Sequence, residues 1–257
     1  MNEIVLRSPD DMHVHLRQDN MLRAVLPYTA KQCSRALVMP NILPPVLTAG
    51  DLQFYRRVIL DSLPENAHFE PLMTFKVVPS TTREQVQQLK EAGAIAGKLY
   101  PDGVTTNSQD GVNDFEALYP VYEEMQNQNL VLCLHGEMPG EFSLDRESKF
   151  LVVLKDIASK FPRLRIVLEH CTTKEAVECV LSLPDNVAAS ITLHHLCLTL
   201  DDVIGGMLSP HVFCKPVAKF PEDRDALVQA ATSGNKKFFL GSDSAPHAVS
   251  SKECSGG

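Results

Sequence analysis

Two histidines, His13 and His15, stand one residue apart near the start of the chain and are followed by Arg17. Because alternate side chains of a β-strand share a face, a strand over residues 11–17 would place all three on one side. Two neutral imidazoles in this arrangement can bind one metal ion. The pair alone fits polar decoration of a strand end equally well, so a metal site requires further ligands from other strands.

Further residues of types that bind metal ions lie near the ends of other apolar runs of the chain. His135 falls in the run 130–137, His170 in 165–171 and Asp243 in 237–243. Together with the first two histidines, they offer four ring nitrogens and a carboxylate oxygen, which is typical of a catalytic zinc site. The alternative is a set of hydrogen-bonded histidines beside loops, and the convergence of so many at strand ends favours the metal.

A lysine, Lys98, lies in the apolar run 95–100. A lysine usually points to water because a buried, unpaired ammonium is costly. If Ile95 and Leu99 pack against helices, however, strand alternation turns Lys98 inward. A buried amine beside other cations loses its proton readily. It could then capture carbon dioxide as a carbamate, a carboxylate-like ligand able to bridge two metals.

Short apolar runs alternate with segments of helical period along the chain, which indicates β-α repeats and a parallel sheet. Several helices are expected to begin at a threonine followed three residues later by an acid, as at Thr48, Thr81 and Thr172. Eight strands are expected, over residues 11–17, 35–41, 68–78, 95–100, 130–137, 165–171, 187–196 and 237–243. We therefore predict one domain over residues 1–257, an α/β fold of the (β/α)₈ TIM-barrel type with its active site at the C-terminal strand ends.

The composition argues against several other classes of protein. The 257 residues carry a net charge of -8 with no basic cluster, which argues against a nucleic-acid partner. No run reaches the roughly 18 apolar residues of a membrane span. The first five residues show no secretory pattern, so a cytoplasmic location is expected. The seven cysteines include no C-x-x-C, which indicates reduced thiols.

Six motifs, taken together and in order, resemble one known family. They are Asp11-Met12-His13-Val14-His15-Leu16-Arg17, Met39-Pro40-Asn41, Gly97-Lys98-Leu99-Tyr100-Pro101, Leu134-His135-Gly136-Glu137, Leu168-Glu169-His170-Cys171 and Gly241-Ser242-Asp243-Ser244-Ala245-Pro246-His247. They resemble the dihydroorotases of the shorter, monofunctional type, within the amidohydrolase superfamily. The resemblance runs through essentially the whole chain from Asp11 onward.

The resemblance implies a hydrolase with two zinc ions that interconverts dihydroorotate and N-carbamoyl-L-aspartate, the third step of pyrimidine biosynthesis. One ion would be held by His13, His15, carbamylated Lys98 and Asp243, and the other by Lys98, His135 and His170. In this family a hydroxide between the ions attacks the ring amide carbonyl. The aspartate, here Asp243, then carries the proton to the departing nitrogen.

The resemblance also implies a substrate site. Arg17 would pair with the substrate carboxylate through its planar fork, and Asn41 and His247 would complete that pocket. Thr105 and Thr106 match the mobile lid of the family, whose hydroxyls reach the bound substrate.

The sequence departs from the family in two places. Lys215 lies in a stretch, 213–216, whose backbone touches the substrate in the family. The sequence ends in the loop after the eighth strand, whereas family members continue with further helices. A barrel without its last helix would leave apolar surface bare between strands eight and one, so we expect a longer biological chain.

Two other functions fit parts of this pattern. Hydantoinases and allantoinases share the metal ligands but bind other rings, and the grouping of Arg17, Asn41 and His247 favours an acidic substrate instead. A non-catalytic barrel used as a scaffold is disfavoured because all the metal ligands are present. A homodimer is expected only by analogy with the family.

Overall fold

A barrel of parallel strands forms the centre of the molecule in this computed structural model, which describes residues 5, 7–106 and 108–256. The strands are β1 (Asp10–Val14), β2 (Arg35–Val38), β3 (Glu70–Val77), β4 (Ala96–Leu99), β5 (Val131–His135), β6 (Arg165–Glu169), β7 (Val187–Ile191) and β8 (Phe238–Leu240). They form one eight-stranded sheet in sequence order, and each paired neighbour is parallel. The absence of a secretory pattern was predicted on residues 1–5, of which 1–4 lie outside the described residues.

The sheet nearly closes on itself where the last strand meets the first. An isolated bridge joins Val14 to Ser244, just beyond β8. The His15 amide donates to the Ser244 carbonyl at 2.9 Å, and the Asp243 amide donates to the His13 carbonyl at 2.9 Å. These bonds lie at the C-terminal ends of both strands, so the predicted (β/α)₈ barrel is confirmed and its seam runs through the predicted metal ligands.

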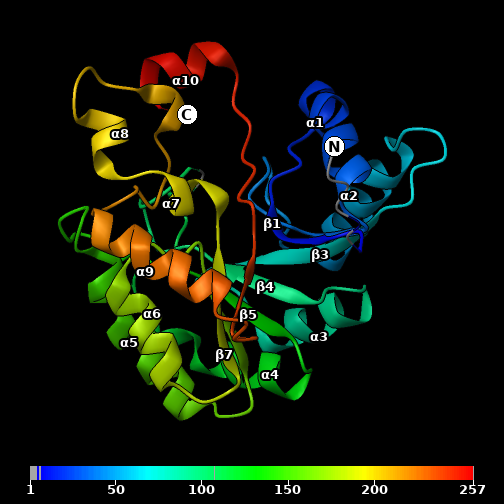
Figure 1. Cartoon of the computed structure of the whole chain (residues 1–257). Helices are drawn as coiled ribbons and strands as arrows, with labels where there is room; N and C mark the ends of the chain where they lie inside the picture. The colour runs from blue at the N-terminus through cyan, green and yellow to red at the C-terminus, as the bar shows by residue number, and fades with distance from the viewer. Residues whose placement is uncertain (1–4, 6, 107, 257) are drawn as a thin grey trace.

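Helices alternate with the strands and cover the outside of the barrel (Figure 1). The α-helices are α1 (Asp19–Gln32), α2 (Ala49–Asp61), α3 (Arg83–Glu91), α4 (Tyr119–Asn127), α5 (Arg146–Lys160), α6 (Lys174–Ser182), α7 (Leu193–Cys197), α8 (Leu200–Ile204), α9 (Pro221–Thr232) and α10 (Val249–Ser255), with short 3₁₀ turns η1 (Glu116–Leu118) and η2 (Pro210–Val212). In Figure 1, α7, α8 and α10 gather at one end of the barrel.

The predicted helix starts are right at one position and one residue early at two. Thr48 caps α2 in a reciprocal pair with Asp51, as expected. The caps of α3 and α6 are Thr82 and Thr173, one residue beyond Thr81 and Thr172. Adjacent threonines offer two similar caps, so the sequence pattern alone does not choose between them.

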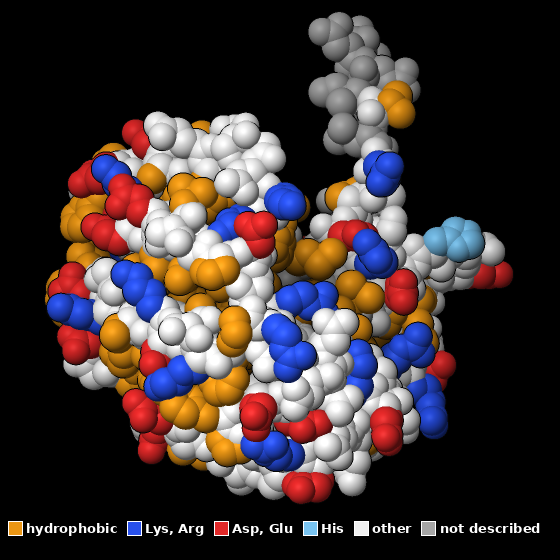
Figure 2. All heavy atoms as spheres, turned by 90° about the horizontal axis from the view of Figure 1, so that it is seen from below, with side chains coloured by type: hydrophobic (Ala, Val, Ile, Leu, Met, Phe, Trp, Pro, Cys, Tyr) orange, Lys and Arg blue, Asp and Glu red, His pale blue; other side chains and the backbone are white. Residues whose placement is uncertain are grey.

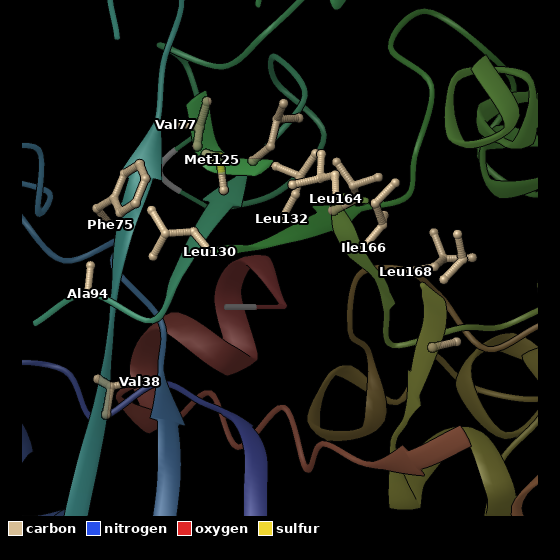
Figure 3. Close-up of a cluster of buried hydrophobic side chains, with 14 of the residues drawn as sticks. Val38, Phe75, Val77, Ala94, Met125, Leu130, Leu132, Leu164, Ile166 and Leu168 are labelled. Atoms are coloured by element: carbon tan, nitrogen blue, oxygen red, sulfur yellow. The ribbon is translucent and has the colours of Figure 1, made fainter. Parts of the chain in front are cut away.

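The apolar core lies mainly between the sheet and the helices. Figure 3 shows part of this layer, in which Phe75 and Val77 of β3, Leu132 of β5, Ile166 of β6 and Met125 of α4 are labelled. Gly97 of β4 is required here, because a Cβ atom at this position would stand 2.8 Å from the Phe75 ring. A separate small cluster fills the barrel interior and consists of Leu37, Met39, Ala96 and Cys133.

Above this inner cluster the barrel interior becomes polar. Strand alternation places Leu132 and Leu134 of β5 in the outer layer and leaves Cys133 and His135 facing inward. The same rule turns Leu99 outward and Lys98 inward on β4, as predicted, with the lysine fully buried. The fold thus presents polar side chains at one end of an otherwise apolar barrel.

Each predicted strand is longer than the observed one, and the difference matters for the site at two of them. The first ends at Val14, so His15 and Arg17 follow it in an irregular segment. The seventh ends at Ile191, and α7 replaces the predicted strand over residues 193–196 because the Thr192 side chain accepts the His195 amide as a helix cap. Strand alternation therefore does not govern His194 and His195.

Both signs of charge are interspersed with apolar side chains over the face seen in Figure 2. Among the described residues, no helix combines the length and apolar character required to cross a membrane.

Candidate active site

Three potential ligand atoms meet at the seam of the barrel. The Nε2 atoms of His13 and His15 lie 3.4 and 3.2 Å from one carboxylate oxygen of Asp243. Burial lowers the pKa of His15 to about 4, against the opposing effect of Asp243, so its ring is neutral near pH 7. Burial would raise the pKa of the Asp243 carboxyl, but the neighbouring histidines outweigh it and hold that pKa well below its usual range.

The other ring nitrogens of these histidines are already engaged. The Nδ1 atom of His13 lies 2.8 Å from Glu169 Oε2, and that of His15 lies 2.8 Å from Asn41 Oδ1. An ionised carboxylate and an amide oxygen can only accept, so both Nδ1 atoms donate and the Nε2 atoms are the ring nitrogens left to bind an ion. Two ring nitrogens that face one carboxylate oxygen offer three ligand atoms, and this arrangement fits a metal ion.

A second group of donors lies beside the first. The rings of His135 and His170 stand 4.6 Å apart, and His170 is 5.2 Å from the His13 ring. His135 Nε2 donates to Glu137 at 2.7 Å, which leaves the lone pair of Nδ1 to bind an ion. Burial lowers the pKa of both histidines and keeps their rings neutral.

Lys98 is a buried amine without a hydrogen-bond partner among the described residues. Its side chain is 0% exposed, and its Nζ atom lies 5.3 Å from the centre of the Tyr100 ring, which in turn is 6.3 Å from the His135 ring. Burial lowers the pKa of this amine, although Glu169 and Asp243 act in the opposite direction. His170 Nδ1 is likewise buried and unpartnered. Buried nitrogen atoms that lack a hydrogen-bond partner, such as these two, fit a centre completed by metal ions.

Three residues at the site hold backbone conformations that are uncommon outside glycine. Arg17, His170 and Asp243 have φ of 59°, 41° and 49°. Each follows a strand end, where the turn in the backbone directs the side chain toward the barrel axis. Such strain costs on the order of 1–3 kcal/mol per residue and is concentrated at functional sites.

A cavity of about 800 Å³ opens above these residues. Its lining includes the predicted metal ligands His13, His15, His135, His170 and Asp243, and the predicted substrate residues Arg17, Asn41, Thr105, Thr106, Lys215 and His247. Lys98 does not line the cavity. The sequence-predicted residues are thus brought to one place, with Lys98 buried in the strand layer beneath.

Arg17 is held in position by its neighbours. Its Nε atom donates to the Pro246 carbonyl at 2.9 Å, and Nη2 lies 3.1 Å from His247 Nε2. A guanidinium has five N–H bonds in a planar fork, so three remain for a ligand, two on Nη1 and one on Nη2. Tyr55 fixes the backbone by donating to the Arg17 carbonyl at 2.8 Å.

The loop that carries Thr105 and Thr106 covers one side of the cavity. The Thr106 carbonyl lies 3.5 Å from the amide nitrogen of Asn41, and Ser108 bonds back to the Thr105 carbonyl at 2.6 Å. Asn107 lies outside the described residues.

Sequence reasoning missed several residues that contribute to the site. Glu169 and Glu137, which orient His13 and His135, each belong to a motif quoted above, but strand-end position alone gave them no role. Tyr100 and His194 line the cavity. His194 lies in α7, within the stretch 187–196 that the sequence predicts to be a strand. Its neighbour His195 is buried and bonds to the Pro216 carbonyl at 2.9 Å.

The class of protein is shown by a family model. The amidohydrolase model matches residues 11–176, which include all the candidate metal ligands except Asp243. The chain therefore belongs to the amidohydrolases.

The particular family follows from closer relatives. Over 258 residues the chain is 48% identical to a dihydroorotase of Neisseria meningitidis serogroup C. This alignment covers 98% of this chain and 75% of the relative. The crystal structure of dihydroorotase from Campylobacter jejuni superimposes with a TM-score of 0.88 at 43% identity, over 95% of this chain and 73% of that one. The dihydroorotase of Saccharomyces cerevisiae in complex with 5-fluoroorotic acid gives 0.88 at 40% identity, over 95% and 71%. This chain belongs to the dihydroorotase family, whose members act on a cyclic amide.

Proposed function

We propose that this chain opens and closes the dihydroorotate ring, with N-carbamoyl-L-aspartate as the open form, in the biosynthesis of pyrimidine nucleotides. It is a hydrolase of the dihydroorotase family, and the observation that carries the proposal is the meeting of His13, His15 and Asp243 at the barrel seam. A small acidic ring fits the cavity above them, which has Arg17 on its wall.

The residues proposed to hold metal divide into two sets that share Lys98. We assign His13, His15, Lys98 and Asp243 to one zinc ion and Lys98, His135 and His170 to the other. Such a pair, when bound, supplies a water of lowered pKa and polarises the amide carbonyl. Metal use is implied by the family, and the support for these residues is the set of unshared ring nitrogens described above.

Lys98 is proposed to carry a carbamate. Its neutral amine would form a bond to the carbon of CO₂ and release one proton to solvent, which turns an amine into an anionic two-oxygen ligand. The lowered pKa of the buried amine supports this step, because only the unprotonated form is nucleophilic.

Asp243 is proposed to move the proton. Its ionised carboxylate can take a proton from the attacking water and deliver it to the ring nitrogen as the amide bond breaks, and ring closure reverses these steps. Its position beside His13 and His15 in the lining of the cavity supports this role.

The walls of the cavity are proposed to bind and orient the substrate. Arg17 would pair with the ring carboxylate through two of its three remaining N–H bonds, with His247 and Asn41 beside it. Thr105 and Thr106 would close over the ring and exclude water, and Lys215, which also lines the cavity, would contact the substrate through its backbone.

Residues 1–257 are proposed to act as one domain, because all eight strands belong to one sheet. The cytoplasmic location and the homodimer expected from the sequence stay predictions.

Turnover assays test the proposal directly. We expect purified protein to close N-carbamoyl-L-aspartate and open dihydroorotate, and a chelator to abolish both. Hydantoin and allantoin should be turned over far more slowly. Faster turnover of either ring than of dihydroorotate would contradict the assignment.

A further inference from the structure

The two edge strands of the barrel, β1 and β8, meet without a regular ladder. Within the described residues, the paired strands of the sheet run in order from β1 to β8, and these two are not paired with each other. The segment that follows β8 runs beside β1 instead (Figure 1), where the Asp243 amide donates to the His13 carbonyl. Gly241 allows this close approach, because a Cβ atom there would stand 2.8 Å from His13 Cβ. The seam of the barrel therefore depends on individual contacts beside the predicted metal ligands.

The carboxylate of Asp11 bonds across this seam. Asp11 lies on β1, two residues before His13, and is 6% exposed. Its Oδ1 atom accepts the backbone amide of His13 at 3.1 Å and that of Ser242 at 2.8 Å. Its Oδ2 atom accepts the Ser242 hydroxyl at 2.5 Å. One buried carboxylate thus receives three hydrogen bonds, which come from both sides of the seam.

These hydrogen bonds act on the backbone of two predicted metal ligands. His13 is one of them, and Ser242 immediately precedes the other, Asp243. Asp243 has a φ of 49°, a conformation that is costly outside glycine and that the surrounding contacts must hold. The Ser242 hydroxyl also accepts the Ser244 amide at 3.1 Å, so it fixes the backbone on both sides of Asp243. The contacts of Asp11 therefore support the 3.4 Å approach of His13 Nε2 to the Asp243 carboxylate.

We propose that Asp11 is a positioning residue, whose buried carboxylate clasps the barrel seam and so holds His13 and Asp243 at the separation that a metal ion requires. Asp11 does not line the cavity, so it acts through the backbone of the two ligands. A carboxylate suits this task, because hydrogen bonds to an ionised group are roughly twice as strong as those between neutral groups. The inference rests on the proposed function for the metal, and it adds a carboxylate outside the ligand set.

The experiment compares Asp11→Asn and Ser242→Ala with the wild type. Amide hydrogen exchange of the metal-free protein reports the clasp, competition with a chelator reports the zinc affinity, and kinetics of ring opening at saturating zinc report kcat and KM. Asp11→Asn keeps the size of the side chain but loses its charge, so we expect exchange at residues 242 and 243 to be about tenfold faster and zinc to bind about tenfold more weakly.

Ser242→Ala is the milder variant, because it keeps the carboxylate and removes one of its three donors. Exchange and zinc affinity should each change by about threefold in this variant. In both variants kcat should fall while KM stays within about twofold, because Asp243 is displaced and the walls that bind the substrate are not.

Asp10→Asn is the matched control. Asp10 is the adjacent residue of the same type, but it pairs with the exposed Arg35. This variant should leave exchange at residues 242 and 243, zinc affinity and kcat unchanged.

Three results would overturn the inference. Wild-type exchange at residues 242 and 243 in Asp11→Asn would show that the carboxylate does not hold the seam. Wild-type zinc affinity in Asp11→Asn, whatever its melting temperature, would indicate a purely structural contact. If Asp11→Asn does not fold, Ser242→Ala decides, and unchanged zinc affinity in that variant refutes the inference.

The test also separates this inference from the proposed reaction. Exchange and zinc affinity are read without substrate, so a wild type that binds zinc but is inactive on dihydroorotate would refute the proposed reaction alone. A wild type that binds no zinc would refute the metal assignment and this inference together.

Discussion

Replacement of Arg17 is the clearest test of how the cavity selects an acidic ring. The guanidinium uses one N–H on the Pro246 carbonyl and one on His247, which fixes its plane and leaves three N–H bonds, two of which can pair with a carboxylate. A hydrogen bond to a charged group contributes about 1.5–3 kcal/mol, so the loss of two bonds, partly replaced by water, corresponds to about 3 kcal/mol. At 1.4 kcal/mol per tenfold, this is about a 10²-fold change in binding.

The Arg17→Ala variant is therefore expected to raise KM about 10²-fold while kcat changes by less than about threefold, because the carboxylate is bound equally in the ground and transition states. Arg17→Lys keeps the charge but loses the planar fork, so its KM should lie between those of the wild type and Arg17→Ala. His247→Ala is the matched control, because it removes the partner of Arg17 Nη2 and disturbs the guanidinium without removing it. Steady-state kinetics of ring opening measure all three, and an unchanged KM in Arg17→Ala, or a loss confined to kcat, would refute this role.

Three further predictions concern groups around the site and the core. Glu169→Gln removes the charge that accepts from His13, and should weaken metal binding by about 10–100-fold in competition with a chelator; unchanged affinity would contradict the role of Glu169. Burial raises the pKa of Tyr55 above its usual value of 10.0, so its neutral form contributes to the unfolding free energy fully below pH 10, and this contribution is lost as the pH rises further. Denaturant titrations should therefore show that the unfolding free energy of Tyr55→Phe falls less steeply above pH 10 than that of the wild type. Equal slopes in the two proteins would count against this role of Tyr55. Gly97→Ala would force a Cβ to within 2.8 Å of Phe75 and should reduce the unfolding free energy by about 1–3 kcal/mol, whereas a neutral result would show that the ring moves aside freely.

The sequence was sufficient to predict the barrel and the residues that meet at its end. Strand alternation oriented Lys98 correctly, because Leu99 has an apolar environment to fill on the outer side. Ile95, however, precedes β4 and is partly exposed, so only one residue of the expected apolar pair packs as predicted.

The parts of the site that lie beyond the strands were less predictable. Arg17 reaches the cavity through a positive φ after β1 has ended, and not through strand alternation. The turn at Thr192 that starts α7 changes the environment of His194, because a side-chain cap competes with continuation of the strand. The role of Glu169 depends on a partner 156 residues away in the sequence, which no local pattern encodes.

The central claim is that six side chains, those of His13, His15, Lys98, His135, His170 and Asp243, form a metal-dependent centre that needs Lys98 as a shared ligand. The most direct measurement is zinc titration of metal-free protein with ring opening followed in parallel, for the wild type and for Lys98→Met, which conserves the volume of the side chain. The account predicts that wild-type activity rises until two ions are bound per chain, and that Lys98→Met binds fewer ions and stays inactive. Full activity in metal-free protein, or wild-type stoichiometry and turnover in Lys98→Met, would contradict it.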